Sequence, residues 1–490
     1  QRREQARAQK LVRFNADAPP TFGAFQALGL GEYDESFLTG GPYSTFQGEK
    51  SFVRSDLDLF SASLELNYNF TDISLKSITA YRTFDSEFGR DSDNSEFDII
   101  QTEDKMNHSQ FSQELQLGNM DKQDSLTWLL GLFYFEESGE NLNVVSITPF
   151  DVISGGGIDN KSWALFGQAS YALSEKLSLT AGARYTAEDK KFLPDQYVRF
   201  NQYTLPVFGG AGFEDGQRIL PLEEFSRDFE NVSVLLSLDY QWNEKLMSYL
   251  SYSEGYKSGG FNQRVFPPRS EPGSFDPEQV SVYELGLKLS NEANTMQLNG
   301  AMFYTDYTDV QVKVIDVVAP GTGNAAGGRI YGGELELTAL MGADFSLQFT
   351  AAYLDTEYTS FADDFDPSQG IDRHSQFVNA PKWSVSCSAN YVVHFSDTGD
   401  LSFRADWSYR SKVYNDASNS EFIAQDNLHL LNAGMVFDSF SGKWQFALQA
   451  RNITDQSYIE TGNDEFNGFG YTERIYGRPR EWSLSVKRFF

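Results

Sequence analysis

The sequence has a single cysteine, Cys387, and few basic residues for its length. One thiol cannot form a disulfide within the chain or build a metal site from several cysteines. The 490 residues include 69 Asp and Glu against 39 Lys and Arg, which gives a formal net charge of -30. Because binding to phosphate backbones needs clustered Lys and Arg, this balance argues against nucleic acid as a partner.

Long apolar runs are also missing. No stretch of about 18 apolar residues occurs, so the sequence provides no transmembrane helix. The mean hydropathy is -0.43, yet 15% of the residues are aromatic, which is unlike a disordered chain. A β-barrel exposes apolar side chains to lipid only at alternate positions, so its mean hydropathy resembles that of a soluble protein. Composition therefore leaves two classes open: about two to four soluble domains, or one large β architecture.

Catalytic and metal-binding patterns are absent as well. The four histidines are scattered, without His-x-x-x-His or Glu-x-x-His spacing. No serine lies in a Gly-x-Ser-x-Gly motif with Asp and His partners. Two acidic clusters, 91–96 and 363–366, lack the glycine-containing spacing of a strong calcium loop. We therefore expect no enzyme activity, no bound metal and no cofactor.

The sequence is rich in strict alternation of apolar and polar residues, the period of a β-strand with one apolar face. Residues 177–186, 383–395 and 401–410 each place apolar side chains on one face and polar or charged ones on the other. The final segment, 479–490, alternates in the same way and ends on two phenylalanines. An aromatic strand end suits a membrane interface, so we predict an all-β transmembrane antiparallel barrel.

The alternating segments predict seventeen strands. They are centred near 57–70, 73–85, 104–118, 126–137, 161–173, 177–189, 229–241, 245–257, 279–290, 294–314, 329–340, 344–358, 382–395, 400–413, 427–438, 444–456 and 479–490. Their connections alternate between short turns and long segments such as 138–160 and 315–328. Short turns on one rim and long loops on the other are typical of an outer-membrane barrel, with the short turns in the periplasm.

The odd strand number has a consequence for the start of the chain. If the last strand runs toward the periplasm, the first strand (57–70) does so too, and the chain enters from outside. A single-chain bacterial barrel has an even strand number. We therefore expect at least one earlier strand that this sequence, which begins with Gln1 and has no signal peptide, does not contain. Residues 1–50 are interpreted as an extracellular loop or the fringe of a missing strand, and 51–490 as barrel.

The tryptophans are placed as a membrane barrel requires. Six of the seven fall at predicted strand ends, beside short turns or beside long loops, and only Trp407 lies in mid-strand. Tryptophan at both interfaces is the aromatic-girdle pattern. The alternative, core tryptophans of soluble β-sandwiches, does not predict such positions.

Several segments resemble the TonB-dependent outer-membrane receptors. They are 251–262 (SYSEGYKSGGFN), 283–288 (YELGLK), 303–312 (FYTDYTDVQV), 451–458 (RNITDQSY) and 476–480 (YGRPR), in the family's order. The resemblance as a whole covers about residues 51–490. The resemblance implies a 22-stranded barrel that follows an N-terminal plug domain with a TonB box. No plug motif is found, so the chain is expected to hold the C-terminal part of the barrel.

The resemblance also implies a location, partners and an activity. The expected location is the outer membrane of a Gram-negative bacterium, in contact with lipid and lipopolysaccharide. The expected partners are the plug domain and, through it, the TonB-ExbB-ExbD system. The expected activity is uptake of a scarce or large nutrient, with a ferric siderophore as the default. Two alternatives stay open: a passive porin-like pore without a plug, and a surface module that binds a partner protein.

Two groups of residues are candidates for function. A charged side chain on the lipid face costs roughly 2–4 kcal/mol at the midplane, so charges on alternating strands are expected to face the lumen. The lumen-facing set, which would contact the plug or be solvated, is Arg184, Glu284, Lys288, Glu334, Glu336, Arg404, Asp406, Arg410 and Arg451. Loop aromatics that would capture ligand, or pack loop against loop, are Tyr203, Phe208, Tyr256, Phe261 and Phe266.

Overall fold

The computed structural model describes residues 2–4, 10–14, 29, 34–49, 54–119, 125–148, 150–201, 212–316, 319–361, 370–466 and 470–490. Within these ranges the regular structure is β, apart from one 3₁₀ turn, η1 (Glu35–Phe37). No helix in these ranges has the length and apolar character needed to cross a bilayer.

Seventeen long strands form one continuous antiparallel series, as predicted. They are β3 (Arg54–Asn69), β4 (Ser74–Asp91), β5 (Ile100–Asn119), β6 (Leu126–Ile147), β7 (Phe150–Ala172), β8 (Leu177–Pro194), β10 (Phe225–Asn243), β11 (Leu246–Lys257), β14 (Glu278–Ser290), β15 (Met296–Asp316), β16 (Ala319–Met341), β17 (Phe345–Phe361), β18 (Trp383–Phe395), β19 (Gly399–Arg410), β20 (Leu428–Ser439), β21 (Trp444–Arg451) and β24 (Glu481–Arg488). The short strands β1 (Arg2–Glu4) and β9 (Tyr197–Asn201) bring the sheet to 19 strands. The predicted fold class is confirmed.

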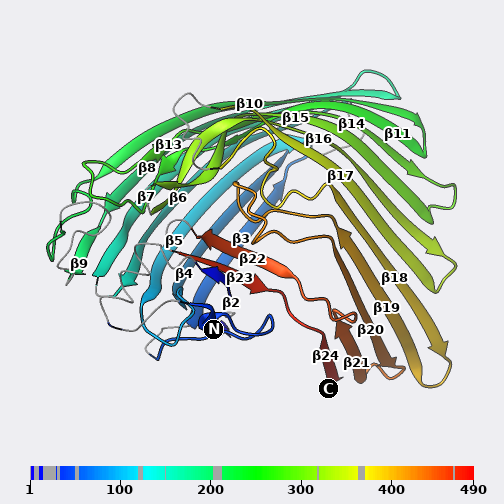
Figure 1. Ribbon diagram of the computed structural model, residues 1–490. Helices are drawn as coiled ribbons and strands as arrows, with labels where there is room; N and C mark the ends of the chain where they lie inside the picture. Colours follow the sequence, from blue (N-terminus) through cyan, green and yellow to red (C-terminus); the bar gives the residue numbers. More distant parts are fainter. Residues whose placement is uncertain are drawn as a thin grey trace.

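The sheet curves strongly around an inner space, with β3 and β24 as the last long strands at its two ends (Figure 1). Two small sheets lie at the end of the molecule where the long connections gather. One pairs β2 (Lys10–Phe14) with β23 (Tyr471–Tyr476), which also pairs with β22 (Ile459–Glu465). The other pairs β12 (Gly260–Phe261) with β13 (Ser274–Phe275).

The two connections named above as long segments, 138–160 and 315–328, are mostly strand, so their prediction as loops is wrong. β6 continues to Ile147 and β7 begins at Phe150, so the connection predicted over 138–160 is a long β-hairpin. The connection predicted over 315–328 is likewise mostly β15 and β16, which are separated by two residues. Beyond the bilayer, lipid no longer imposes an apolar face, so a ladder can continue without alternation. Residues 1–50 also contain β2, which the sequence did not reveal.

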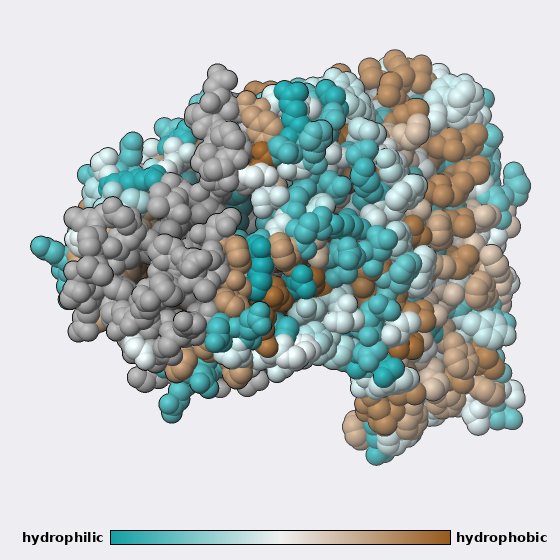
Figure 2. Space-filling view, viewed as in Figure 1, coloured by the Kyte–Doolittle hydropathy of each residue, from teal (hydrophilic) through white to brown (hydrophobic). Residues whose placement is uncertain are grey.

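The outer face of the long strands carries exposed apolar side chains. Register places Tyr252, Tyr283, Tyr304 and Tyr331 in one row across four neighbouring strands, and the ring centroids of the first two are 4.9 Å apart. Rows of Leu and Met follow toward the short turns. In Figure 2, hydrophobic residues gather at the right, where β17–β19 run to the short turns, and hydrophilic residues cover the centre. This pattern is that of a lipid-facing band bounded by an aromatic girdle.

The tryptophans exclude a soluble sandwich. Six of them are exposed: Trp163, Trp242, Trp383, Trp407, Trp444 and Trp482. In a sandwich, these rings would be buried between two stacked sheets. Their exposure instead leaves them free to contact lipid.

The clusters of buried hydrophobic residues lie at the long-loop end. One cluster joins Leu11 and Tyr471 of the β2–β23 pair to Ile100 and Ile147, at the ends of β5 and β6. A second joins Phe150 of β7 to Phe266 of the connection after β11. These contacts hold the long connections against the inner side of the strand ends, and they shape the cavities described next.

Candidate functional site

All nine charged residues of the predicted lumen set lie on the inner side of their strands by alternation. Lys288 pairs in register with Asn299, which pairs with Glu336 on the next strand. The neighbouring positions Leu287 and Leu335 are exposed on the outer face. The inner wall is therefore lined with charge, whereas the outer wall is apolar.

Some of these charges have partners on the same wall. Arg404 pairs with Asp406, with Nη2 and Oδ1 2.7 Å apart. The Tyr249 hydroxyl donates to Glu284 Oε1 at 2.5 Å. The Arg184 guanidinium lies near two inward-facing phenyl rings. These contacts satisfy part of the charge, and whether the residues also contact a plug stays a prediction.

The three predicted loop aromatics that the structure describes have different surroundings. Phe266 is buried and packs against Phe150 and Phe213, whose ring centroids lie 6.1 and 5.2 Å away. Tyr256 donates to Glu188 at 3.3 Å. Phe261 lines one cavity, and Phe266 lines a second one. The remaining two, Tyr203 and Phe208, lie outside the described residues.

The segment that follows β11 builds the cavity wall, and its glycines explain part of the SGGFN sequence. A Cβ on Gly259 would lie 2.4 Å from the carbonyl oxygen of Phe275, so a side chain does not fit there. The Asn262 side chain bonds the backbone of Thr322 in both directions, accepting at 2.7 Å and donating at 3.0 Å. The motif therefore fixes the segment against β16.

The same segment then crosses the inner side of β7 and β8 and reaches β5. The Gln196 side chain donates to Gln263 O at 2.7 Å. Arg264 forms an ion pair with Asp104 of β5, with Nη2 and Oδ1 2.7 Å apart. This connection therefore covers part of the inner space at the long-loop end, where a solute entering from that side would meet it.

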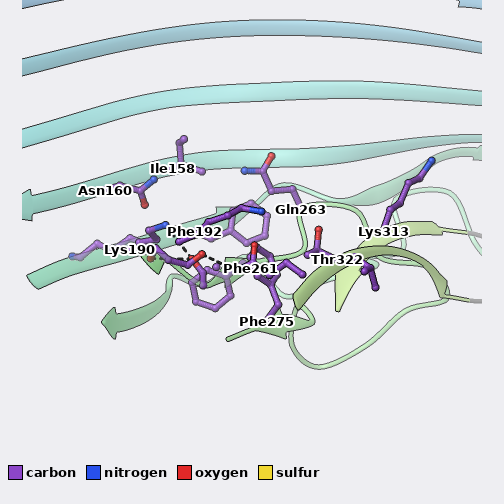
Figure 3. A pocket seen from close by; sticks show the side chains of 16 residues that line it. Ile158, Asn160, Lys190, Phe192, Phe261, Gln263, Phe275, Lys313 and Thr322 are labelled. Atoms are coloured by element: carbon purple, nitrogen blue, oxygen red, sulfur yellow. Dashed lines mark hydrogen bonds between the residues drawn. The ribbon is translucent and has the colours of Figure 1, made fainter. Parts of the chain in front are cut away.

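A cavity of about 470 Å³ lies between this segment, the upper part of β8 and the ends of β15 and β16. Its wall contains the rings of Phe192, Phe261 and Phe275 (Figure 3). It also contains four lysines: Lys190, Lys191, Lys257 and Lys313. Sequence reasoning found only Phe261 of this set. The lysines come from three separate segments, and only Lys257 lies in a recognised motif.

A second cavity, of about 370 Å³, adjoins the first and shares Lys313 with it. Its wall is mainly apolar, with residues of both buried clusters. Arg90, Arg264 and Glu465 supply its other charges. The two cavities together form a cationic and aromatic inner surface, the part of the described residues best suited to hold a solute.

A buried polar cluster closes the far side of the second cavity. Asp93 accepts hydrogen bonds from the backbone N–H groups of Ser95 and Ile100, at 3.0 and 2.6 Å. Burial, with the nearby Asp91 carboxylate, raises the pKa of Asp93 to about 7. Burial likewise raises the pKa of Glu473, although Arg90 Nη1 lies 3.3 Å from its Oε1 and opposes the shift. The 91–96 cluster thus serves the fold of its own loop.

No group of three or more His, Cys, Asp or Glu side chains suited to a metal ion occurs among the residues that the structure describes. The second acidic cluster, 363–366, lies outside those residues.

Comparison with known proteins gives one family and a set of similar folds. The profile of the family "TonB dependent receptor-like, beta-barrel" matches residues 3–453. The probable TonB-dependent siderophore receptor PiuA of Acinetobacter baumannii is 24% identical over 188 residues, which are 38% of this chain and 24% of that protein.

Solved structures agree on the fold. The ferric yersiniabactin uptake receptor FyuA from Yersinia pestis superimposes with a TM-score of 0.75 at 17% identity, over 89% of this chain and 62% of that one. The ferric-catecholate import receptor Fiu from E. coli K12, in its closed form, gives 0.72 at 12% identity, over 100% and 71%. The chain therefore spans only part of the length of these proteins.

Proposed function

Because this chain belongs to the family of TonB-dependent receptors, we propose that it forms the barrel wall of a transporter in the outer membrane of a Gram-negative bacterium. The transporter takes up a nutrient that is too scarce or too large for porins. The family match over residues 3–453 is the observation that carries this proposal. The apolar outer face, the charged inner wall and the cavities at the long-loop end support it.

The proposed substrate class is an iron-bearing siderophore. One of the similar proteins, PiuA, is named as a probable siderophore receptor, and another, FyuA, is named as a ferric yersiniabactin uptake receptor. The two adjoining cavities offer cationic and aromatic side chains to a solute from the long-loop side. In this proposal the long-loop end faces the outside of the cell, because the ligand is captured from that side.

The proposed partners follow from the same role. A plug domain occupies the barrel, and TonB with ExbB and ExbD acts on that plug to admit the ligand. Inner-wall charges that keep exposed surface, such as Glu334, Glu336 and Arg404, contact the plug. Lipid and lipopolysaccharide surround the outer face. The protein acts as a transporter and not as an enzyme.

Uptake of radiolabelled iron tests the proposal. Cells that carry the full-length gene, cells that lack it and cells that lack TonB are compared during iron-limited growth, each with a panel of ferric siderophores. We expect accumulation of at least one ferric siderophore that needs both the gene and TonB. Solute flux that needs the gene but not TonB would instead establish a passive pore.

A crosslinking experiment tests the inner-wall assignment. Cysteine replaces Glu334 in a variant in which Cys387 is replaced by Ser, and a thiol-reactive photocrosslinker is attached. We expect a crosslink within the plug domain of the full-length protein. Labelling by water-soluble thiol reagents with no crosslink to protein would favour a solvated lumen.

A further inference from the structure

The first cavity has a charge that differs from that of the whole chain. Of the 16 side chains around it, four are lysines and none is Asp or Glu (Figure 3). Yet acidic residues outnumber basic ones 69 to 39 in the sequence. Positive groups gathered in a concave surface raise the local concentration of anions. The cavity is thus an anion-attracting site in an acidic protein.

Two of the lysines keep their charge available to a ligand. Lys190 Nζ donates to the neutral carbonyl oxygen of Gly259 at 3.0 Å. In the part of the chain that the structure describes, no carboxylate lies within ion-pair distance of Lys190 or Lys313. Lys190 is half-buried and Lys313 is exposed; Glu188 and Glu137 act on Lys190, and Glu465 on Lys313, only from beyond ion-pair distance. An ammonium group that holds no carboxylate at ion-pair distance can still pair with an anion beside it.

The other two lysines are already engaged to different degrees. Lys191 Nζ lies 3.1 Å from Glu224 Oε1, and Lys257 Nζ lies 3.7 Å from Glu278 Oε1. The anionic groups of a ligand must therefore pair chiefly with Lys190 and Lys313.

The space between these two lysines is aromatic. Figure 3 shows Lys190 and Lys313 on opposite sides of Phe261 and Phe275. Phe261 stacks on the buried Phe192, with ring centroids 6.2 Å apart, so its position is fixed from behind. A planar apolar body fits against such rings, because aromatic faces give a large contact area at low entropy cost.

We propose that this cavity binds a small organic anion with an aromatic body and two separated anionic groups, which pair with Lys190 and Lys313. The inference rests on the proposed uptake function, since it assumes that this site meets a solute from outside the cell. It narrows the substrate class: neutral sugars and cationic solutes do not match two unpaired ammonium groups, and a purely aliphatic anion leaves the rings uncovered.

Binding of a matched set of probes to the full-length protein in detergent micelles tests the inference. The probe is naphthalene-2,6-dicarboxylate, and its binding is followed by its fluorescence at low and moderate salt. Naphthalene-2,6-dimethanol keeps the rings without the charges, and adipate keeps the charges without the rings. We expect the dicarboxylate to bind best and to weaken as salt rises, because screening reduces charge pairing.

Four variants assign that binding to the cavity. Lys190→Gln and Lys313→Gln are each expected to weaken it by roughly tenfold, the effect of about 1.4 kcal/mol. Lys190→Arg keeps the charge and is expected to restore most of the affinity. Lys245→Gln removes the same charge at a short turn, where Lys245 bonds Asn294, and is expected to change nothing.

Three results would overturn the inference: no binding of the dicarboxylate, equal binding of the neutral diol, or equal affinity in all four variants. The outcome is separable from that of the uptake experiment. Binding is measured on purified protein without TonB, so the proposed anion-binding site can be confirmed even if the uptake experiment gives a negative result. Conversely, if the cells take up ligand equally well with Lys190→Gln or Lys313→Gln in the receptor, only the proposed ligand class is refuted.

Discussion

A charge placed on the outer face of β16 tests the lipid-facing assignment most sharply. Leu335 is exposed on that face, in register with Gly300 and Ala351, between the tyrosine row and the short turns. Leu335→Arg would bring a guanidinium to mid-bilayer depth, at a cost of roughly 2–4 kcal/mol. That cost corresponds to a roughly 30- to 700-fold shift in the folding equilibrium.

The matched control lies on the same strand. Thr338 is three residues away and faces inward by alternation, so Thr338→Arg adds the same group on the polar side. Urea titration of both variants in phospholipid vesicles, followed by tryptophan fluorescence, measures the two free energies of unfolding. We expect the outward variant to lose the stated stability and the inward one to lose under 1 kcal/mol. Equal losses, or a larger loss at Thr338, would refute the assignment of the faces.

Three further predictions concern the long-loop end. Gly259→Ala forces a Cβ against Phe275 O and should detach the segment after β11, seen as faster protease cleavage there. The folded-state pKa of Asp93, raised to about 7 from 3.8, means that its loop is most stable below pH 4 and loses stability as pH rises to about 7. The protection factor of the Ile100 amide, which is its exchange rate corrected for base-catalysed intrinsic exchange, should therefore fall across that window. Arg13→Ala should free β2 at a local cost on the order of 2 kcal/mol, with roughly 30-fold faster amide exchange.

Each of these has a control on the same molecule. Gly300→Ala meets its nearest atoms at 3.7 Å and should leave cleavage unchanged. Asp93→Asn cannot ionise, so the protection factor of the Ile100 amide in this variant should not vary across the same pH window, and persistent variation would point to another group. Arg13 lies 3.5 Å above the ring of Phe422 and pairs with Asp464, so Arg13→Lys should retain part of the protection. No change in amide exchange of β2 for Arg13→Ala would show that Arg13 does not hold β2 in place.

The strand cores were predictable because lipid imposes one simple rule on them. Every second residue of the spanning part must be apolar, so segments such as 177–186 and 401–410 reveal their strands and their faces directly. The turn between Asn69 and Ser74 was found for the same reason, as a break in that rule. Strand ends beyond the lipid, such as 138–147 of β6, follow no such rule and were missed.

The cavity and the small inner sheet were not predictable, because distant segments build them. β2 pairs with β23, and Arg13 meets Asp464 across 451 positions of sequence. Nothing local in either segment signals the other. Lys190 and Lys313 likewise come together only through the curvature of the sheet, and each alone resembles an ordinary exposed lysine.

The lone cysteine permits the most direct measurement of the central claim, that neighbouring residues of one strand face lipid and lumen in turn. Cys387 lies on the outward side of β18, and Ser388 bonds the inward Asp406. A fluorophore is attached at Cys387, or at position 388 in the double variant Cys387→Ser, Ser388→Cys, and the full-length protein is placed in bilayers of brominated lipid. If the two positions face lipid and lumen in turn, we expect strong lipid quenching at 387, and at 388 only quenching by water-soluble iodide. Equal lipid quenching at both positions would contradict it.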